Sequence, residues 1–230
     1  MNVIKPVISE TSESRVSEAK QETYYMVLFA SQTPVWRKPK AHCFASFVRV
    51  PAAGEDGERE EPEIHTISWY PAAGRCRVIH PPEEGVNSAL DITIERCKKA
   101  RMNLYKWGPV QIKKEFYDKA VLRASQLHAG ELRWQALDKS TRRQGVAVNC
   151  IHALSDLDIE NGYVEFGLCS GRSAAEQMAR MFSKWVISPE TATTLFSILN
   201  LPSRNHGLGT VTSSLANVPA YLLFCCALFR

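Results

Sequence analysis

The chain has 230 residues, of which 45% are hydrophobic and 23% charged, a composition that is ordinary for a soluble globular protein. Its formal net charge of +4 is spread along the sequence, so the charge does not single out nucleic acid as a partner. The seven cysteines are odd in number and include no CxxC pair, which argues against a disulfide framework and favours a reducing compartment.

The first half of the chain is expected to be rich in strands. Residues 1–22 are polar, charged and aperiodic, and we expect a disordered leader there. Residues 41–50 alternate in the way typical of a strand, with His42 on one face and Cys43 on the other. An acidic loop separates this strand from a second predicted strand over residues 64–70. Shorter strands are predicted over residues 24–30, 76–79 and 131–138.

The second half of the chain is dominated by helical patterns. Residues 139–144 read as a basic loop and residues 163–169 as a strand, whereas Asp156 and Asp158 are expected late in a helix and exposed. Because strands come first and helices follow, the predicted fold class is α+β rather than an alternating parallel sheet. Apolar spacing and capping residues predict helices over residues 88–102, 114–128, 151–157, 173–186 and 189–200.

Cys150 is the strongest candidate for a catalytic residue. A cysteine attacks as its thiolate, and the unpaired backbone N–H groups at the start of a helix lower the pKa of a thiol. Asn149 is a favourable N-cap residue for the helix that follows. The same N–H groups can stabilise an oxyanion. The alternative is a packed core thiol, which is the usual state of a cysteine among apolar neighbours.

A nucleophilic cysteine needs a base, and the sequence offers six histidines. His42 and His65 each lie near the start of a predicted strand, so a hairpin can bring them together. One imidazole would then take the thiol proton and the other would orient it, which is the logic of a catalytic triad. His152 lies two residues after Cys150 and is expected to point away from the thiol on a helix.

Three segments resemble the circularly permuted branch of the NlpC/P60 papain-like superfamily: AHCFASF at residues 41–47, HTISW at residues 65–69, and Asn149-Cys150 before a helix. In that superfamily a helix that carries a cysteine packs against a small antiparallel sheet. The sheet carries a histidine and, on the neighbouring strand, a polar third residue. In permuted members the histidine strands precede the cysteine helix, as they do in this sequence. The resemblance implies such a domain over residues 23–206, elaborated by extra helices.

Carried over by position, the resemblance makes Cys150 the nucleophile, His42 the base and His65 the orienting residue. Asn149 and Trp69 are the candidates for substrate binding, and neither a metal nor a cofactor is expected. The implied activity is that of a thiol hydrolase (an amidase or a peptidase) or an acyltransferase. The thiolate attacks an amide or ester carbonyl, and water or a second acceptor releases the acyl-cysteine intermediate. The resemblance suggests amides in cell-wall peptides, lipids or protein conjugates.

The sequence leaves two other functions open. The chain is alternatively a non-enzymatic interaction protein in which Cys150 is a core residue. The second alternative is a zinc-binding module, although the spacing of the candidate ligands matches no common zinc pattern. These ligands are His42, His65, Cys76 and His80.

The two ends of the chain bear on its location. The N-terminal stretch lacks the apolar region of a secretory signal, so we expect a cytoplasmic protein, with export as an effector as the alternative. Residues 207–229 carry no charge, but their apolar part is shorter than the roughly 20 residues that span a bilayer. We expect residues 207–230 to form a buried terminal element, with membrane contact as the less favoured alternative.

Overall fold

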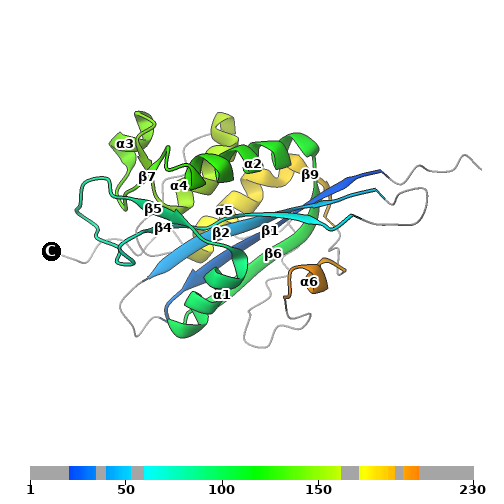
Figure 1. Cartoon of the computed structure of the whole chain (residues 1–230), viewed down its shortest axis with the longest axis horizontal. Coiled ribbons are helices and arrows are strands. Elements are labelled where there is room, and N and C mark those ends of the chain that lie inside the picture. Colours follow the sequence, from blue (N-terminus) through cyan, green and yellow to red (C-terminus); the bar gives the residue numbers. More distant parts are fainter. Residues whose placement is uncertain (1–20, 35–39, 53–59, 162–170, 190–193, 202–230) are drawn as a thin grey trace, which may run out of the picture.

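The computed structural model describes residues 21–34, 40–52, 60–161, 171–189 and 194–201. Within these residues the fold is α+β, as predicted, with one five-stranded antiparallel sheet between two groups of helices (Figure 1). The strand order in the sheet is β3-β2-β1-β6-β9, so β3 and β9 are its edges. The five strands are β1 (Thr23–Gln32), β2 (Ala41–Val50), β3 (Glu63–Ile67), β6 (Asn103–Ile112) and β9 (Val186–Ser188).

Two smaller sheets lie beside the main one. β4 (Trp69–Pro71) and β5 (Gly85–Asn87) pair in antiparallel orientation. β7 (Arg133–Trp134) and β8 (Ala147–Val148) pair in parallel orientation, and β8 leads directly into the helix that begins at Cys150. These short strands therefore set where the candidate nucleophile enters the fold.

Six α-helices fall within the described residues, on both sides of the sheet. Figure 1 shows α2 (Lys114–His128) and α5 (Gly171–Met181) over one face, with α1 (Leu90–Lys99) and the short α6 (Leu195–Ile198) on the other. The remaining two, α3 (Lys139–Arg143) and α4 (Cys150–Ser155), lie on the same side as α2. The 3-10 segments η1 (Asp156–Asn161) and η2 (Phe182–Trp185) continue α4 and α5.

The alternation predicted for residues 41–50 is confirmed by the two hydrophobic cores. Cys43 and Phe47 are buried with residues of α2, α4 and α5, whereas Phe44 and Val48 are buried with residues of α1 and α6 on the opposite face. A side chain on β2 therefore reaches one helical layer or the other according to whether its number is odd or even. His42 shares the face of Phe44, with which its ring is stacked.

The sequence does not predict β6, although this strand pairs with β1 over its whole length. The reason is the Gly108-Pro109 pair in the middle of the strand, which is a typical turn signal. In the structure Gly108 has a φ of +93° and lies opposite a register shift between Met26 and Leu28 of β1. A Cβ atom at Gly108 would lie 2.6 Å from the backbone oxygen of Met26, so only glycine fits this close approach.

Other local predictions were wrong or lie outside the described residues. Residues 76–79 form no strand, and residues 139–143, expected to be a loop, form α3. The predicted strand over residues 64–70 is divided at Ser68 into β3 and β4, because the chain leaves β2 at that point. Three predicted segments lie almost or wholly outside the described residues: the leader, the strand over residues 163–169 and the terminal segment 207–230.

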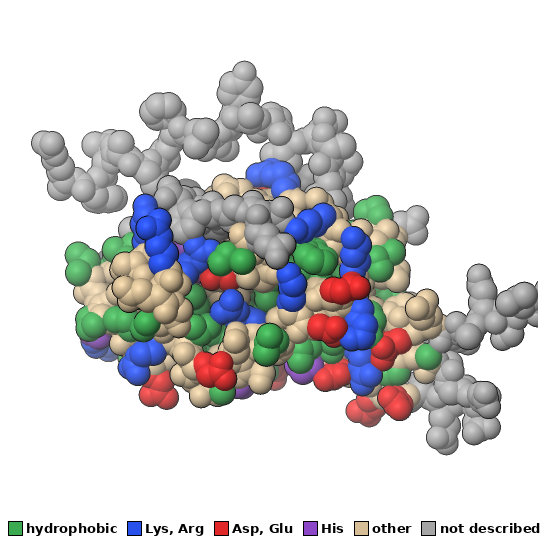
Figure 2. All heavy atoms as spheres, turned by 90° about the horizontal axis from the view of Figure 1, so that it is seen from above, with side chains coloured by type: hydrophobic (Ala, Val, Ile, Leu, Met, Phe, Trp, Pro, Cys, Tyr) green, Lys and Arg blue, Asp and Glu red, His purple; other side chains and the backbone are tan. Residues whose placement is uncertain are grey.

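Figure 2 shows no single charged patch on the described surface over α2 and α5 that grey atoms leave in view. Figure 2 shows Lys and Arg side chains scattered across this face among apolar and acidic ones, with acidic side chains gathered toward one end. In the part of the chain that the structure describes, no helix combines the length and the apolar character that a bilayer crossing requires.

Replacing Gly85 with alanine is expected to destabilise the fold by overpacking. A Cβ atom at Gly85 would lie 2.0 Å from the indole of Trp69, whose side chain is 1% exposed and has no room to move. We expect Gly85→Ala to lower the free energy of unfolding by about 1–3 kcal/mol, measured by urea denaturation. Ala73→Ser, in the exposed turn between β4 and β5, is the control and should leave stability unchanged. Equal stability of the two variants would contradict the close packing of Trp69 against Gly85.

Candidate functional site around Cys150

The start of α4 is fixed by a side-chain cap on Asn149. Asn149 has extended backbone angles, and its Oδ1 atom accepts hydrogen bonds from the backbone N–H groups of Ile151 and His152, both at 2.9 Å. This is the arrangement expected of an N-cap asparagine. The helix therefore begins at Cys150, as the sequence predicts.

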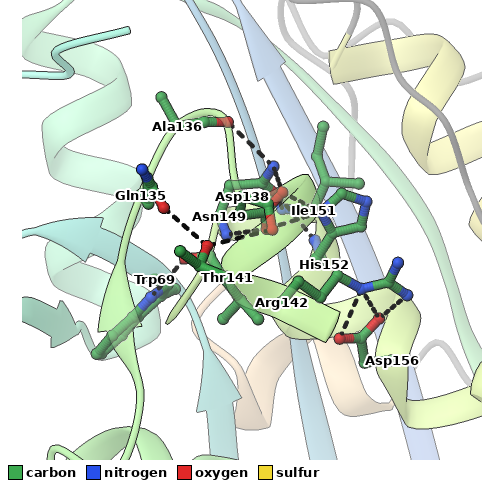
Figure 3. Close-up of polar contacts among 11 residues, drawn as sticks. Trp69, Gln135, Ala136, Asp138, Thr141, Arg142, Asn149, Ile151, His152 and Asp156 are labelled. Carbon is green, nitrogen blue, oxygen red and sulfur yellow. Dashed lines mark hydrogen bonds and ion pairs between the residues drawn. The ribbon is translucent and has the colours of Figure 1, made fainter. Parts of the chain in front are cut away.

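Asp138 holds the cap in place (Figure 3). Its carboxylate accepts hydrogen bonds from the backbone N–H of Asn149 (2.7 Å) and from the Asn149 side-chain amide (3.2 Å), and it contacts His152 Nδ1 at 2.8 Å. Asp138 is 2% exposed and His152 is 5% exposed. A buried carboxylate with three donors is well satisfied, so this group fixes the helix start rather than facing a substrate.

Two ion pairs lie at and just after the far end of α4, and the aspartate of each is buried. Asp156 accepts hydrogen bonds from the guanidinium of Arg142, at 2.8 Å from Nε, and both side chains are almost fully buried. Asp158, which is 1% exposed, pairs with Lys184 at 2.8 Å. The expectation that Asp156 and Asp158 are exposed was therefore wrong, because each meets a cation from another element. α4 is thus held at both ends.

The sulfur of Cys150 lies at the open end of β2. β3 pairs with β2 only from Ala45 to Arg49, so the backbone of Cys43 is left without a β3 partner. The N–H of Cys43 donates a hydrogen bond to the Cys150 sulfur, and the N–H of Cys150 itself also faces it. The residue is partly exposed. The candidate nucleophile therefore lies where a helix start meets a free strand end.

The thiol of Cys150 is neutral in this environment. Burial raises its pKa to about 11, whereas the N–H groups of Cys43 and Cys150 lower it; the charges of Cys76 and Asp138 add to the increase. The backbone N–H groups thus lower the pKa of the thiol, as expected at a helix start, but desolvation raises it by more. Cys150 needs a base in order to react at neutral pH.

His42 is held on the α1 side of β2 by Ser68. The His42 Nε2 atom lies 3.0 Å from the Ser68 hydroxyl, which also forms a 2.7 Å hydrogen bond with the Thr93 hydroxyl. The Tyr70 ring stacks on the imidazole, with 3.9 Å between ring centroids. Burial, and to a lesser extent the charge of Arg96, lowers the pKa of His42 to about 3. The imidazole is therefore neutral, with one nitrogen engaged and its ring orientation fixed.

No hydrogen bond joins the Cys150 thiol to an imidazole in the part of the chain that is described. The connection between Cys150 and His42 is the backbone: the Cys43 N–H that contacts the sulfur belongs to the residue after His42. Tyr70 adds a second link between the two residues. Its ring stacks on the His42 imidazole. Burial raises the pKa of Tyr70, and the charges of Cys97 and Cys150 raise it further.

The structure does not bring His65 to His42. His65 is paired with Phe47 of β2, five residues from His42, and shares the face of Phe47 rather than that of His42. Its Nε2 atom lies 2.7 Å from Glu63, and its ring meets the edge of Tyr117 on α2. The hydrogen bond to the His42 imidazole comes instead from Ser68.

The side chains of Asn149 and Trp69, which were expected to bind substrate, are engaged within the protein. The Asn149 side chain is occupied by the cap and by Asp138. Trp69 is 1% exposed, and its Nε1–H donates to the backbone oxygen of Val148 (3.1 Å), two residues before Cys150. In this structure both residues position Cys150.

The candidate zinc ligands are not gathered into a site. His42 contacts Ser68, whereas His80 contacts Arg77 and the backbone oxygen of Pro81. Among the described residues no group of three or more His, Cys, Asp or Glu side chains is placed to hold a metal ion.

Sequence reasoning missed Ser68 as a member of the site and left the role of Asp138 open. Ser68 lies inside the HTISW segment at residues 65–69, where the polar residue between two apolar ones was the available signal. Asp138 is eleven residues before Asn149, and only the fold reveals their contact. No protein-family model, curated protein or solved structure matches this chain.

Loss of the Asn149 side chain is expected to loosen the helix start. Asn149→Ala removes the cap of two N–H groups and leaves the buried carboxylate of Asp138 with fewer donors. We expect a loss of about 1–2 kcal/mol in the free energy of unfolding, measured by chemical denaturation. Asn149→Ser, which keeps a capping oxygen, should recover part of this loss. An alanine variant as stable as the parent would contradict the capping role.

The alkylation of Cys150 is expected to depend steeply on pH. Because burial raises its pKa to about 11, the reactive thiolate is scarce at neutral pH and grows about tenfold for each pH unit between pH 7 and 10. Iodoacetamide labelling followed by peptide mass spectrometry measures the rate at Cys150 alone. In the urea-unfolded chain, the rate should level off near the ordinary thiol pKa of about 8.5. A rate in the folded chain that levels off below pH 8 would contradict the neutral resting thiol.

Proposed function

We propose that the chain is a thiol hydrolase or acyltransferase in which Cys150 is the nucleophile, His42 the base and Ser68 the residue that orients His42. One observation carries the proposal: the Cys150 sulfur, at the start of α4, is hydrogen-bonded by the N–H of Cys43, the residue next to His42. The thiol thereby lies beside β2 next to the residue that follows His42, whereas the His42 side chain lies on the face of β2 that α1 covers.

The two ring nitrogens of His42 would have different roles: one orients the ring and the other accepts the proton. Nε2 is engaged by Ser68, and no hydrogen bond among the described residues engages Nδ1. An imidazole oriented through one nitrogen can accept a proton at the other. The hydroxyl of Ser68 would take the orienting role that the resemblance gave to His65, and the hydroxyl of Thr93 donates a hydrogen bond to it.

Cys150 and His42 are both neutral before substrate binds, and this determines how the proton would be transferred. With the thiol pKa raised to about 11 and the imidazole pKa lowered to about 3, a preformed thiolate–imidazolium pair is disfavoured. The Cys150 proton would therefore pass to His42 Nδ1 as the sulfur attacks the carbonyl carbon, in the manner of general base catalysis. Contacts of this kind are often long in the free enzyme and shorten when substrate binds.

The remaining steps follow from the groups around the sulfur. The N–H groups of Ile151 and His152 are used by the Asn149 cap, so the N–H of Cys150 is the first-turn donor left for the developing oxyanion. The carbon–nitrogen or carbon–oxygen bond of the substrate then breaks, and His42 returns its proton to the leaving group. Water or a second acceptor attacks the acyl-cysteine, which restores the thiol.

The resemblance to permuted NlpC/P60 papain-like proteins supports this assignment. A helix that begins with a cysteine, preceded in sequence by antiparallel strands that carry a histidine and a polar partner, is the order found here in β2, the Ser68 segment and α4. This order is compatible with amidase, peptidase and acyltransferase chemistry.

The assignment is tested by four variants assayed on p-nitrophenyl esters and aminocoumarin amides. Cys150→Ala should abolish turnover. His42→Asn should lower kcat roughly 10²–10⁴-fold, the usual contribution of a general base. Ser68→Ala should lower kcat less and should shift its pH profile, because the imidazole loses its partner at Nε2.

His65→Ala is the matched control for His42→Asn. It should leave kcat and KM unchanged, because His65 faces α2 and Glu63. Circular dichroism verifies that each variant is folded. Full activity in His42→Asn, or a loss confined to His65→Ala, would contradict the proposed dyad.

A further inference from the structure

A cavity of about 420 Å³ runs along the free edge of β3, away from Cys150. β3 is the edge strand of the main sheet, and one side of its backbone has no neighbouring strand among the described elements. We call this cavity the β3 groove. Its lining consists of residues 64–66 of β3, residues 88–91 at the start of α1, Ala124 and His128 of α2, and residues 198–200 at the end of α6.

Asn87 shows which backbone groups of β3 face the groove. Its side-chain amide donates to the backbone oxygen of Thr66 (2.8 Å) and accepts from the backbone N–H of Ser68 (2.7 Å). The amide thus pairs with the edge as a peptide group of a neighbouring strand would. Backbone groups alternate in direction along an antiparallel strand, so those of Ile64 and Thr66 point away from β2.

The edge beyond Asn87 offers hydrogen-bonding groups that nothing else in the described chain uses. The N–H of Thr66 and both the N–H and C=O of Ile64 make no hydrogen bond within the described residues. They lie in a row on one strand. An extended peptide needs this pattern in order to add to a sheet, whereas a compact small molecule does not.

The groove walls indicate which side chains such a peptide would carry. The side chains of Ile64 and Ile198 line the groove and are 41% and 38% exposed, so an apolar side chain is favoured between them. Asp91 also lines the groove, is exposed and forms no ion pair within the described residues. A basic side chain would complement this carboxylate.

We propose that the β3 groove binds an extended segment of a partner protein, which adds to the sheet as a strand next to β3. Its backbone pairs with Ile64 and Thr66, an apolar side chain packs between Ile64 and Ile198, and a Lys or Arg lies at Asp91. The groove is separate from the Cys150 site, and the proposal does not depend on catalysis.

A phage-displayed library of random twelve-residue peptides, selected against the full chain, supplies the probe. Selected peptides should alternate apolar and polar residues and include a basic one. Ile64→Pro removes the outward N–H without breaking a bond to β2, and proline is tolerated at this kind of edge position. It should weaken a selected peptide about tenfold or more, the effect of losing a backbone hydrogen bond and its fit.

Two further variants separate backbone pairing from charge. Ile64→Val keeps the N–H and a branched side chain, and should bind the peptide nearly as the parent does. Asp91→Lys should weaken the basic peptides and favour a version in which the basic residue is replaced by Glu. Thermal unfolding shows that each variant is folded, and unchanged affinity in both Ile64→Pro and Asp91→Lys overturns the proposal.

Amide hydrogen exchange of the full chain, read by NMR, locates the bound strand. The N–H of Thr66 should exchange fast in the free chain and become protected when the peptide is added. His65, whose N–H faces β2, should be protected in both states. A Thr66 amide that is already protected without peptide would mean that this chain or a second copy fills the groove. That result, or no protection with peptide, overturns the proposal.

Discussion

The hydrogen bonds between Asp138 and Asn149 hold the start of α4, and the position of the Cys150 sulfur follows from that start. The buried carboxylate holds the backbone and side-chain amides of Asn149, whose Oδ1 atom caps the helix. The cap in turn places the Cys150 sulfur against the N–H of Cys43 at the end of β2. Trp69 acts from the other side by binding the oxygen of Val148. The thiol is thus positioned by buried groups that do not react.

The same burial sets a limit on the chemistry. A thiol at a helix start is expected to be acidic, yet desolvation outweighs the backbone N–H groups and leaves Cys150 neutral. His42 is also neutral because its ring is enclosed between Tyr70 and Phe44. In the proposed mechanism such a pair would resemble a serine–histidine dyad more than a preformed ion pair, because the proton would move only during attack. It also protects the thiol from adventitious oxidation, which acts on thiolates.

Local patterns in the sequence predicted the parts of this arrangement that depend on neighbours along the chain. The alternation of His42 and Cys43 on β2, the cap at Asn149 and the α+β class follow from residue spacing. The partner of His42 did not follow, because Ser68 reaches it only where the chain leaves the sheet after β3. Asp138 and the ion pair between Arg142 and Asp156 depend on contacts between separate elements. β6 was missed because a glycine–proline pair lies within a strand, where the fold tolerates it at a bulge.

The central claim is that Cys150 carries an acyl group during turnover. The direct measurement is to mix the full chain with an activated thioester, quench it in acid within the first turnover and map the acyl group by peptide mass spectrometry. The account predicts a hydroxylamine-sensitive acyl group on the peptide that contains Cys150, formed more slowly in His42→Asn. An acyl group distributed over the exposed Cys76 and other thiols, or one on Cys150 that forms equally fast without His42, would contradict it.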